Sequence, residues 1–379
     1  MSVSNSYISR SSITLTASKL TGALPAISGA SLTGITSQDT LSFRNLIING
    51  GMKVAQRGTD TAKLYDYCGP DRFYFGGDGS QRSTISQASL AIDSKGQANA
   101  WRMEVTTASG SPSAGHFQVL QYRFEGQDLQ HLKKGTANAE ALTLQFWVKS
   151  PKTGIHIVEL ADQDNSRHIS KSYTVSSANT WQKVVITFAG DTTGAITNDN
   201  ARRLDLNFWL MAGSTYTSGT LQTSWGSDTD ANRAVGQVNC VDSTSNNFYL
   251  TGVQLEVGSA ATDFEHRSYG DELLRCCRYF YKADGYNSHA MISRSSTAIG
   301  ATVNTPVPMR ASPTAGAGNW CRVMKSTTTD DYGDSSTGSF TVGGAAPTVT
   351  QTGSSVFLEY GSMSNFIKKI PETIEDLIQ

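Results

Sequence analysis

The chain has 379 residues, which as a prior corresponds to two or three domains. Its 31 basic and 32 acidic residues are well mixed and give a formal net charge of −1, so no basic stripe indicates a nucleic-acid or anionic-membrane partner. No run of about 18 apolar residues occurs, and the first residues lack the pattern of a secretory signal, so we expect neither membrane insertion nor export by that route.

Residues 1–45 differ in composition from the rest of the chain. Ser, Thr, Gly and Ala dominate, and the triplet LTG occurs at 20–22 and again at 32–34. One copy of such a segment cannot bury a core, so it is either a disordered tail or an extended segment that orders against copies of itself or a larger partner. We favour the extended attachment segment. The residues expected to make its contacts are Leu20, Leu24, Ile27, Leu32 and Ile35.

Residues 46–268 contain short segments in which apolar and polar residues alternate, separated by turns rich in Gly, Asn, Asp and Ser. About nine such segments are strand candidates, and their length and spacing predict a β-sandwich of the jelly-roll type. The candidates are NLIIN before the Asn-Gly turn, DRFYF, WRMEV, FQVLQYRFEG, LTLQFWVKS, IHIVELAD, WQKVVITFAG, RLDLNFWLMAG and NNFYLTGVQLEVG.

A linking helix is predicted over residues 269–282. Ser268 and Asp271 have the spacing of a capping box, and apolar residues then recur at helical spacing. That stripe consists of Leu273, Leu274, Cys276, Cys277, Phe280 and Tyr281.

Two further parts are predicted after this helix. Strand patterns resume over residues 283–364 and indicate a smaller β domain. Residues 365–379 then form an amphipathic pattern, with apolar residues spaced by four, four and three and with Pro371 in the first turn. A helix of this length is unstable alone, so we expect it to dock on its own domain or on a neighbour.

The acidic residues near the linking helix have structural explanations. The apolar parity of the last long strand switches at Thr251-Gly252, which predicts a β-bulge. Glu256 is then expected to face outward, and Asp271 and Glu272 lie near a helix N-terminus, where negative charge is favourable. We therefore interpret residues 253–277 as a scaffold and not as an active site.

Few patterns point to catalysis. The chain has no G-x-S-x-G, H-E-x-x-H or P-loop motif, and its six histidines are scattered, so we expect no enzyme activity. The five cysteines contain no C-x-x-C pair and are odd in number. This usage favours reduced thiols in a protein folded in the cytosol.

Calcium is the one metal that the loops suggest, because oxygen-rich turns suit it. Asp191 and Asp199 lie in such a turn region, and a second oxygen-rich turn spans residues 162–165. Turn chemistry explains both equally well, so we expect no cofactor and keep structural calcium as the alternative.

Exposed aromatic rings are the residues most useful for binding a sugar, because their flat apolar faces stack on pyranose rings. Tyr216 and Trp225 lie in a loop rich in Gly, Ser and Thr, and Trp320 and Tyr332 are similar candidates in the second β domain. Packing at a sandwich edge is the competing explanation. The other tryptophans in apolar alternation are assigned to the core: Trp147, Trp181 and Trp209.

Several motifs resemble those of one family, the tail-fibre-like virion proteins of bacteriophages and prophages. The stretch FYLTGVQLEVGSAATDFEHRSYGDELLRCCRYF (248–280) is similar to a signature of these proteins, in which a strand leads through a connection into a helix. NLIINGGMKVAQRGT resembles their opening, and PVPMRASPT the start of their C-terminal domain. KLTGALPAISGASLTGI resembles fibre shaft segments. TWQKVVITFAGDTTGAITNDNARRL and LMAGSTYTSGTLQTSWGS resemble a carbohydrate-binding-module jelly roll.

The resemblance implies a virion structural protein, usually a homotrimer and assembled in the host cytoplasm. It would attach by its N-terminus to other tail or capsid proteins and present β domains to a host-surface glycan. The chain departs from the family at Asn365, since the amphipathic tail has no counterpart. Two other functions remain: a capsid or neck decoration protein without a receptor role, and a free carbohydrate-binding or glycan-cleaving protein.

Overall fold

The computed structural model describes residues 44–91, 95–282, 291–295, 298–312, 348–352 and 355–361. The chain divides into two compact units, Met1–Phe43 and Arg44–Gln379, and every described residue belongs to the second. The predicted attachment segment 1–45, with all five of its contact residues, and the predicted helix 365–379 therefore lie almost wholly outside the described part. Their roles, and the predicted domain boundaries, stay predictions.

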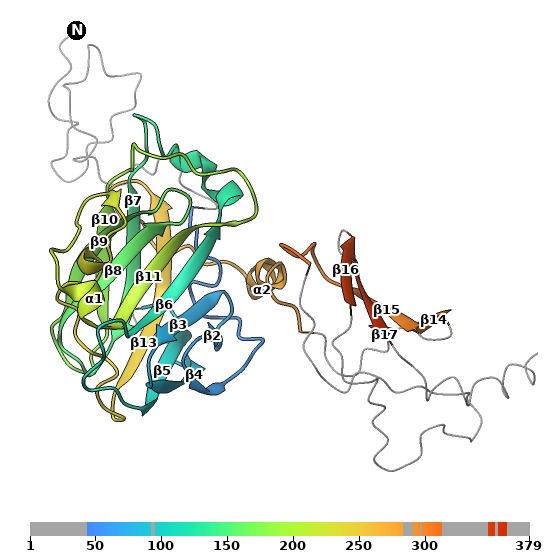
Figure 1. Ribbon diagram of the computed structural model, residues 1–379, viewed down its shortest axis with the longest axis horizontal. Coiled ribbons are helices and arrows are strands. Elements are labelled where there is room, and N and C mark those ends of the chain that lie inside the picture. Colours follow the sequence, from blue (N-terminus) through green and yellow to red (C-terminus); the bar gives the residue numbers. More distant parts are fainter. Residues whose placement is uncertain are drawn as a thin grey trace, which may run out of the picture. The chain divides into compact units, whose positions relative to one another are not determined.

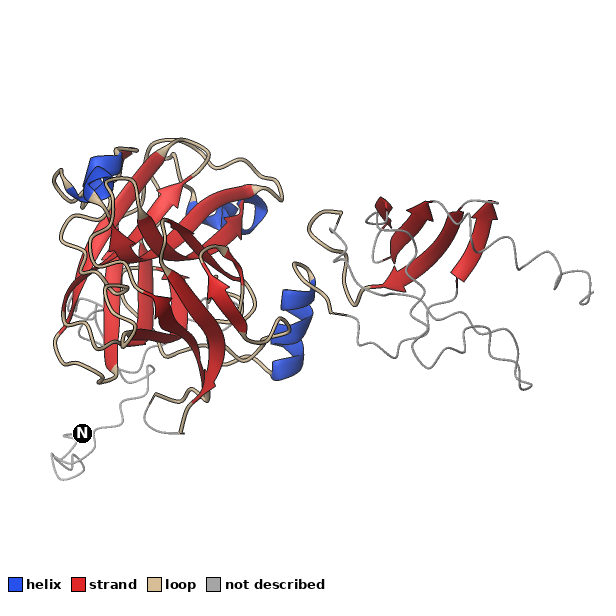
Figure 2. Cartoon of the chain, turned by 60° about the horizontal axis from the view of Figure 1, so that its bottom comes forward, coloured by secondary structure: helices blue, strands red, loops and turns tan. Residues whose placement is uncertain are grey.

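Two antiparallel sheets form a sandwich, so the predicted mainly-β sandwich is confirmed (Figures 1 and 2). The six-stranded sheet has the order β1 (Asp60–Lys63), β4 (Arg82–Ser89), β5 (Asn99–Thr107), β13 (Asn247–Val257), β7 (Leu142–Lys149), β10 (Gln182–Phe188). The seven-stranded sheet has the order β12 (Gly226–Ser227), β9 (Arg167–Val175), β8 (Gly154–Asp162), β11 (Arg202–Ala212), β6 (Phe117–Glu125), β3 (Phe73–Asp78), β2 (Asp66–Tyr67).

The core lies between the sheets because alternate side chains of most of their long strands are apolar and point inward. Phe146 of β7 meets Phe208 of β11 edge to face, with ring centroids 5.1 Å apart. Both rings are fully buried. Burying each such ring stabilises the fold by roughly 2 to 3 kcal/mol.

The central strand β11 is buried on both faces. Leu206 and Phe208 point into the core, whereas Trp209 points to the outer face and is nevertheless only 2% exposed. The loop that follows β11, with helix α1 (Ser214–Thr217) and the 3₁₀ helix η6 (Asp230–Asn232), packs over this outer face. A second 3₁₀ helix, η5 (Gly126–Leu132), follows β6.

Some predicted strands were wrong or missing. Residues 45–48 form no strand; they run beside β13 with isolated backbone bonds, such as Leu46 N to Leu255 O at 2.9 Å. Strands β4 and β9 were not predicted, because both are rich in Ser and lack a clear alternation of large apolar residues. Their hydrogen bonds to neighbouring strands outweigh this weak local preference.

The β-bulge predicted in β13 is confirmed. The pairing of β13 with β7 shifts register between Thr251 and Gln254, and Gly252 has φ of +60°, a conformation that favours glycine. Glu256 faces outward, as its parity predicts, but it is not open to solvent there, since the residue is only 2% exposed. The segment after β13 folds back over the outer face and covers it, as Thr262 N donates to Glu256 Oε1 at 2.8 Å.

The linking helix is confirmed as α2 (Tyr269–Cys277), with the predicted cap. Asp271 N donates to Ser268 Oγ at 3.1 Å. The helix ends five residues earlier than predicted, and its apolar stripe is only partly buried: Cys276 and Cys277 are buried, whereas Leu274 is 45% exposed.

A separate antiparallel sheet of four strands lies in the C-terminal part of the chain. Its order is β14 (Met291–Ser295), β15 (Ala298–Asn304), β17 (Ser355–Gly361), β16 (Thr348–Thr352). The strands fall within the range where strand patterns predicted a second β domain.

Four of the five cysteines are described, and Cys68, Cys240, Cys276 and Cys277 are all buried and free. This confirms reduced thiols at those positions, whereas Cys321 lies outside the described residues. Burial raises the pKa of the Cys68 and Cys240 thiols to about 12, so they are inert apolar groups in the core.

The free energy of unfolding should fall as the pH is lowered below neutral, because His156 is buried. This imidazole is fully buried and stacks on Tyr173, and burial lowers its pKa to about 4. Below pH 6.5 the unfolded chain binds a proton here, whereas the native state does not until about pH 4, so the free energy of unfolding falls through this window. The loss is roughly 3 kcal/mol, at 1.36 kcal/mol per pKa unit.

Urea unfolding between pH 7 and pH 4 checks this expectation. His156→Gln should be less stable at neutral pH because it loses the stacking, but its stability should decline less steeply with acid. An acid slope identical to that of the unchanged protein would contradict the assignment.

Candidate functional site

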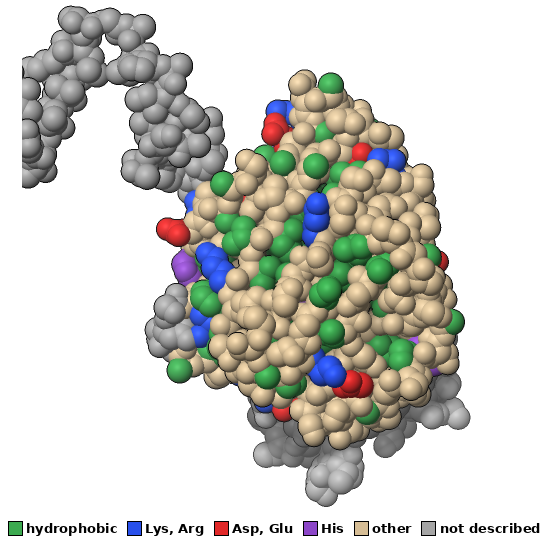
Figure 3. All heavy atoms as spheres, turned by 90° about the vertical axis from the view of Figure 1, so that its left-hand side faces the viewer, with side chains coloured by type: hydrophobic (Ala, Val, Ile, Leu, Met, Phe, Trp, Pro, Cys, Tyr) green, Lys and Arg blue, Asp and Glu red, His purple; other side chains and the backbone are tan. Residues whose placement is uncertain are grey.

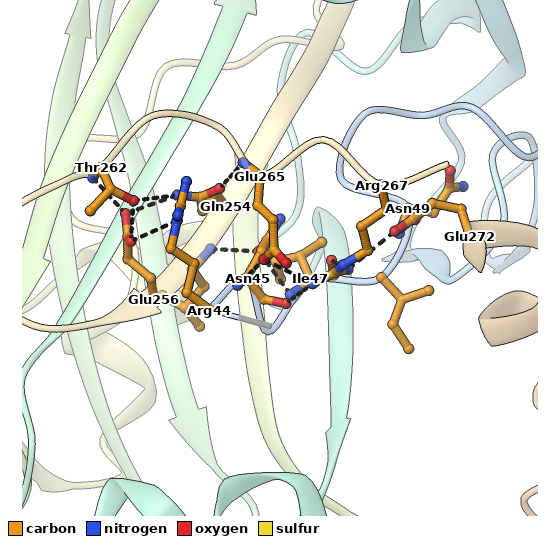
Figure 4. A network of polar contacts seen from close by, with 12 residues as sticks. Arg44, Asn45, Ile47, Asn49, Gln254, Glu256, Thr262, Glu265, Arg267 and Glu272 are labelled. Carbon is orange, nitrogen blue, oxygen red and sulfur yellow. Dashed lines mark hydrogen bonds and ion pairs between the residues drawn. The ribbon is translucent and has the colours of Figure 1, made fainter. Parts of the chain in front are cut away.

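The stretch 253–272 forms a polar network with residues 44–49 (Figure 4). Arg267 is at its centre. Its Nη1 donates to Ile47 O and to Glu272 Oε1, each at 3.1 Å, and its Nη2 donates to Asn45 O at 2.5 Å. Nη2 also lies 3.2 Å from Glu265 Oε2, and Glu272 accepts a further bond from Asn49 N.

The same network continues along β13. Asn45 Nδ2 donates to Val253 O at 3.1 Å, and Asn45 Oδ1 accepts from Leu255 N at 3.1 Å, so this side chain replaces a missing strand partner. Glu265 N donates to Gln254 Oε1 at 2.7 Å, and Gln254 Nε2 donates to Glu256 Oε1 at 2.9 Å. Each acid therefore accepts bonds from the protein's own groups.

The network lies where the chain leaves the sandwich, since α2 follows directly after Arg267 and Ser268. Backbones also meet closely here: a Cβ on Gly50 would lie 2.0 Å from Val253 O, so only glycine fits. The carboxylates are bound by the chain's own groups, so we interpret the arrangement as a structural junction. We call it the Arg267 junction.

Removing one carboxylate should weaken the sandwich. Glu272→Ala leaves the Arg267 guanidinium and the Asn49 N–H without their acceptor in a buried setting, at a cost of about 3 kcal/mol. Glu140→Ala is the matched control, because Glu140 pairs with Lys133 on the surface and such pairs contribute below about 1 kcal/mol. Urea midpoints measure both, and equal losses would contradict the role given to the junction.

The two aspartates considered for calcium are not brought together. Asp199 pairs with Arg203, which also pairs with Asp164. Asp191 is buried and binds Arg167 through two hydrogen bonds, of 2.8 and 3.0 Å. Among the residues that the structure describes, no group of three or more His, Cys, Asp or Glu could hold a metal ion.

An ammonium group occupies the oxygen-rich position beside Asp191. Lys134 is buried, and its Nζ lies 2.5 Å from Asp162 Oδ2 and 3.1 Å from Asp191 Oδ2. It also donates to the carbonyl oxygens of Thr193 and Gly194, at 3.0 and 2.8 Å. Burial alone would raise the pKa of Asp191, but the bonds from Arg167 and Lys134 lower it. Two carboxylates and two carbonyls form the kind of ligand set that calcium takes.

Lys134→Met should therefore destabilise the fold by about 3 kcal/mol, because two buried carboxylates lose their shared cation. Added calcium should raise the melting temperature of this variant and not that of the unchanged protein. Lys133→Met, at the exposed neighbour, is the control and should show neither effect. Melting curves with and without calcium chloride decide the matter; a variant as stable as its parent would contradict the role of Lys134.

Two of the predicted sugar-binding aromatics, Tyr216 and Trp225, are partly exposed and pack against neighbouring side chains. Tyr216 contacts the rings of Phe117 and Trp209, at centroid distances of 5.6 and 5.3 Å. Trp225 packs against the core, and its Nε1 donates to Ala189 O at 2.7 Å. The two residues pack against different clusters of buried side chains. Trp320 and Tyr332 lie outside the described residues.

The outer face of the seven-stranded sheet is polar but closed by its own bonds. Glu159 and Asp205 are fully buried there. Glu159 binds Arg233 at 2.8 and 3.0 Å, and Asn207 donates to Glu159 Oε2 at 2.8 Å. Burial raises the pKa of Asp205, although Arg202 beside it lowers that pKa in part. A ligand would have to break these pairs to enter, so we do not favour this face.

Aromatic rings lie on the outer face of the six-stranded sheet, at Trp147, Trp181 and Tyr249. Trp147 and Trp181 were assigned to the core, and this was wrong, since both are partly exposed, as is Tyr249. Phe146 and Val148 point inward from β7, so Trp147 and Lys149 point outward. Because this parity was visible in LTLQFWVKS, sequence reasoning could have found Trp147.

Strand register places these groups in adjacent rows. Lys183 of β10 is opposite Trp147 of β7, and in the next outward-facing row Lys149 of β7 is opposite Tyr249 of β13. The Lys149 ammonium lies 4.0 Å from the Tyr249 ring centroid and 5.4 Å from that of Trp181. Trp181 and Tyr249 meet edge to face at 6.1 Å. We call Trp147, Lys149, Trp181, Lys183 and Tyr249 the aromatic–lysine face.

The bulge in β13 supports this face from below. A Cβ on Gly252 would lie 3.1 Å from Trp147 Cδ1, so glycine lets the indole approach the sheet. Partial burial lowers the pKa of the Lys149 ammonium.

Figure 3 shows another view of the surface, in which charged side chains are few and scattered among polar and hydrophobic ones. No helix among the described residues is long and apolar enough to span a bilayer.

Comparison with known proteins finds similarity in structure only. No family model matches the chain, and no curated protein does. Similar solved structures include the enzymatically active domain of bacteriophage CBA120 tailspike protein 4, at 12% identity and a TM-score of 0.30, covering 56% of this chain and 21% of that one.

Several similar structures are carbohydrate-binding modules. A family 11 module from Clostridium thermocellum in complex with a mixed-linked tetrasaccharide has 13% identity and a TM-score of 0.27, covering 55% of this chain and 98% of the module. The module TmCBM61 in complex with β-1,4-galactotriose has 9% identity and a TM-score of 0.29, covering 57% and 99%. None of these similarities is high enough to assign a function.

Proposed function

We propose that this chain is a structural protein of a phage virion, of the tail-fibre type, and that it works without catalysis or a cofactor. The observation that carries the proposal is the Arg267 junction. It joins the two stretches that resemble the family most, one at Asn45–Asn49 and one at 253–272, into a single network. The resemblance therefore falls on residues that fasten the sandwich within a longer chain.

The junction suits a module inserted into a fibre. Residues 1–43 precede it and α2 follows it, so the sandwich is secured at both ends by the same bonds. We propose that residues 1–45 attach to other tail or capsid proteins and that three copies assemble. Trimerisation would bury the small aliphatic residues that one copy leaves in water.

Host-surface glycan is the proposed ligand of the sandwich, and the aromatic–lysine face is its proposed binding surface. Partly exposed indole and phenol rings supply flat apolar area for pyranose rings. Weak contacts of this kind become strong when several copies act on one particle. A capsid or neck decoration protein without a receptor role, and a free glycan-binding or glycan-cleaving protein, are the competing functions.

Deleting residues 1–43 from a phage that encodes the chain tests the proposal. The deletion stops before Arg44, so it leaves the Arg267 junction intact, and the truncated chain should still fold. We expect the full chain in purified particles, detected by mass spectrometry and located by electron microscopy, and the truncated chain to be absent from them.

Host adsorption separates the fibre from the decoration protein. Particles carrying Trp181→Ala should contain the protein in normal amount and adsorb more slowly to the host. Normal adsorption would favour the decoration role. Absence of the full chain from particles would overturn the virion assignment and favour the free protein.

A further inference from the structure

We infer that the aromatic–lysine face binds an acidic saccharide, one whose sugar rings carry carboxylates. The inference rests on the proposed glycan binding and adds the ligand's charge. Nothing in the similarity to known structures points to this face or to this charge; its own residues carry the argument.

The first step is the alternation of rings and cations across three strands. Lys183 faces Trp147 in one row, and Lys149 lies between Trp181 and Tyr249 in the next. Each ring thus has an ammonium group within reach of the same ligand. A saccharide stacked on a ring would place its ring substituents beside a cation.

The second step is the charge balance of the face. Lys149 and Lys183 form no ion pair with any other described residue. The row of Lys149 and Tyr249 continues to Arg102 of β5, which pairs with Glu104 of the next row at 2.9 Å. The face is therefore positive although the whole chain has a formal net charge of −1. Such local excess attracts an anion and fixes its register.

The third step is the shape of the surface. The other half of this sheet face is covered by the segment after β13, as Gln145 Nε2 donates to Thr262 O and Thr143 Oγ1 to Gly258 O, at 2.6 and 2.7 Å. Beyond this cover the three rings are partly exposed. A third ammonium group, Lys95 Nζ, lies 5.3 Å from the Trp181 ring centroid and 6.0 Å from that of Trp147. An extended polymer can lie across such a partly exposed surface and does not need to enter a closed pocket.

A purely structural role for the lysines makes a different prediction. Cation–π contacts at exposed sites make a small contribution to stability. If that were their only role, removing the lysines would lower the free energy of unfolding and would not change the affinity for any saccharide. Binding and stability must therefore be measured on the same variants.

The test uses the full chain and one polymer in two charge states: polygalacturonate and its methyl ester, which keeps the sugar and removes the charge. Alginate, hyaluronate and polysialic acid extend the acidic panel, and affinity is measured by titration calorimetry and affinity electrophoresis. We expect at least one acidic polymer to bind at least tenfold more tightly than the methyl ester, and that binding to weaken with salt.

The variants are Lys149→Gln with Lys183→Gln, and Trp181→Ala. The double lysine variant should bind the acidic polymer with about tenfold lower affinity and should bind the methyl ester as the unchanged protein does. Trp181→Ala should weaken the binding of both polymers. Tyr65→Ala, at a ring 64% exposed elsewhere on the sandwich, is the control and should change neither. Urea unfolding confirms that the variants are folded.

Three outcomes would overturn the inference: equal binding of the two charge states, no binding to any acidic polymer, or binding that the lysine variants leave unchanged. Equal binding that Trp181→Ala abolishes would still leave the proposed glycan function standing. Tighter binding of oligo-dT than of every acidic saccharide would instead assign the face to single-stranded nucleic acid.

Discussion

The Arg267 guanidinium is the group on which the rest of the sandwich depends, because it holds together parts of the chain 220 or more residues apart. It donates to the backbone of Asn45 and Ile47 while pairing with the carboxylate of Glu272. Arginine suits this place because its planar fork serves several acceptors at once and stays charged when buried. Without it, the carbonyl oxygens of Asn45 and Ile47 would lose this donor, and Glu272 of α2 would lose its cation.

Local features of this region could be predicted from sequence because they depend on neighbours in the chain. The Ser268 cap needs only the hydroxyl and an N–H three residues on, and the Gly252 bulge shows as a switch of parity. The exposure of Glu256 could not be predicted in this way. Parity correctly places it on the outer face, but whether that face meets water depends on the returning segment at Thr262.

Trp147 and Trp209 show the same limit of prediction from sequence. Each follows an inward-facing phenylalanine and so points outward, which alternation alone reveals. Trp209 is buried by the loop that carries Tyr216 and Ala234, whereas Trp147 stays partly open. A sequence states which face a residue takes; the cover over that face comes from segments distant along the chain, whose position no local pattern encodes. The bonds of the buried Lys134 ammonium could not be predicted for the same reason, since the oxygens that it contacts belong to residues 162 to 194.

The two outer faces of the sandwich thereby differ in what they can do. On the seven-stranded sheet, charged groups are numerous but are paired with each other under a packed loop, so a ligand would have to replace strong bonds inside a buried setting. On the open half of the six-stranded sheet, the rings and ammonium groups contact each other only weakly and keep access to solvent. Binding there would replace water and would break no buried ion pair of the face. Recognition on this sandwich is therefore expected where its side chains are least committed to the fold.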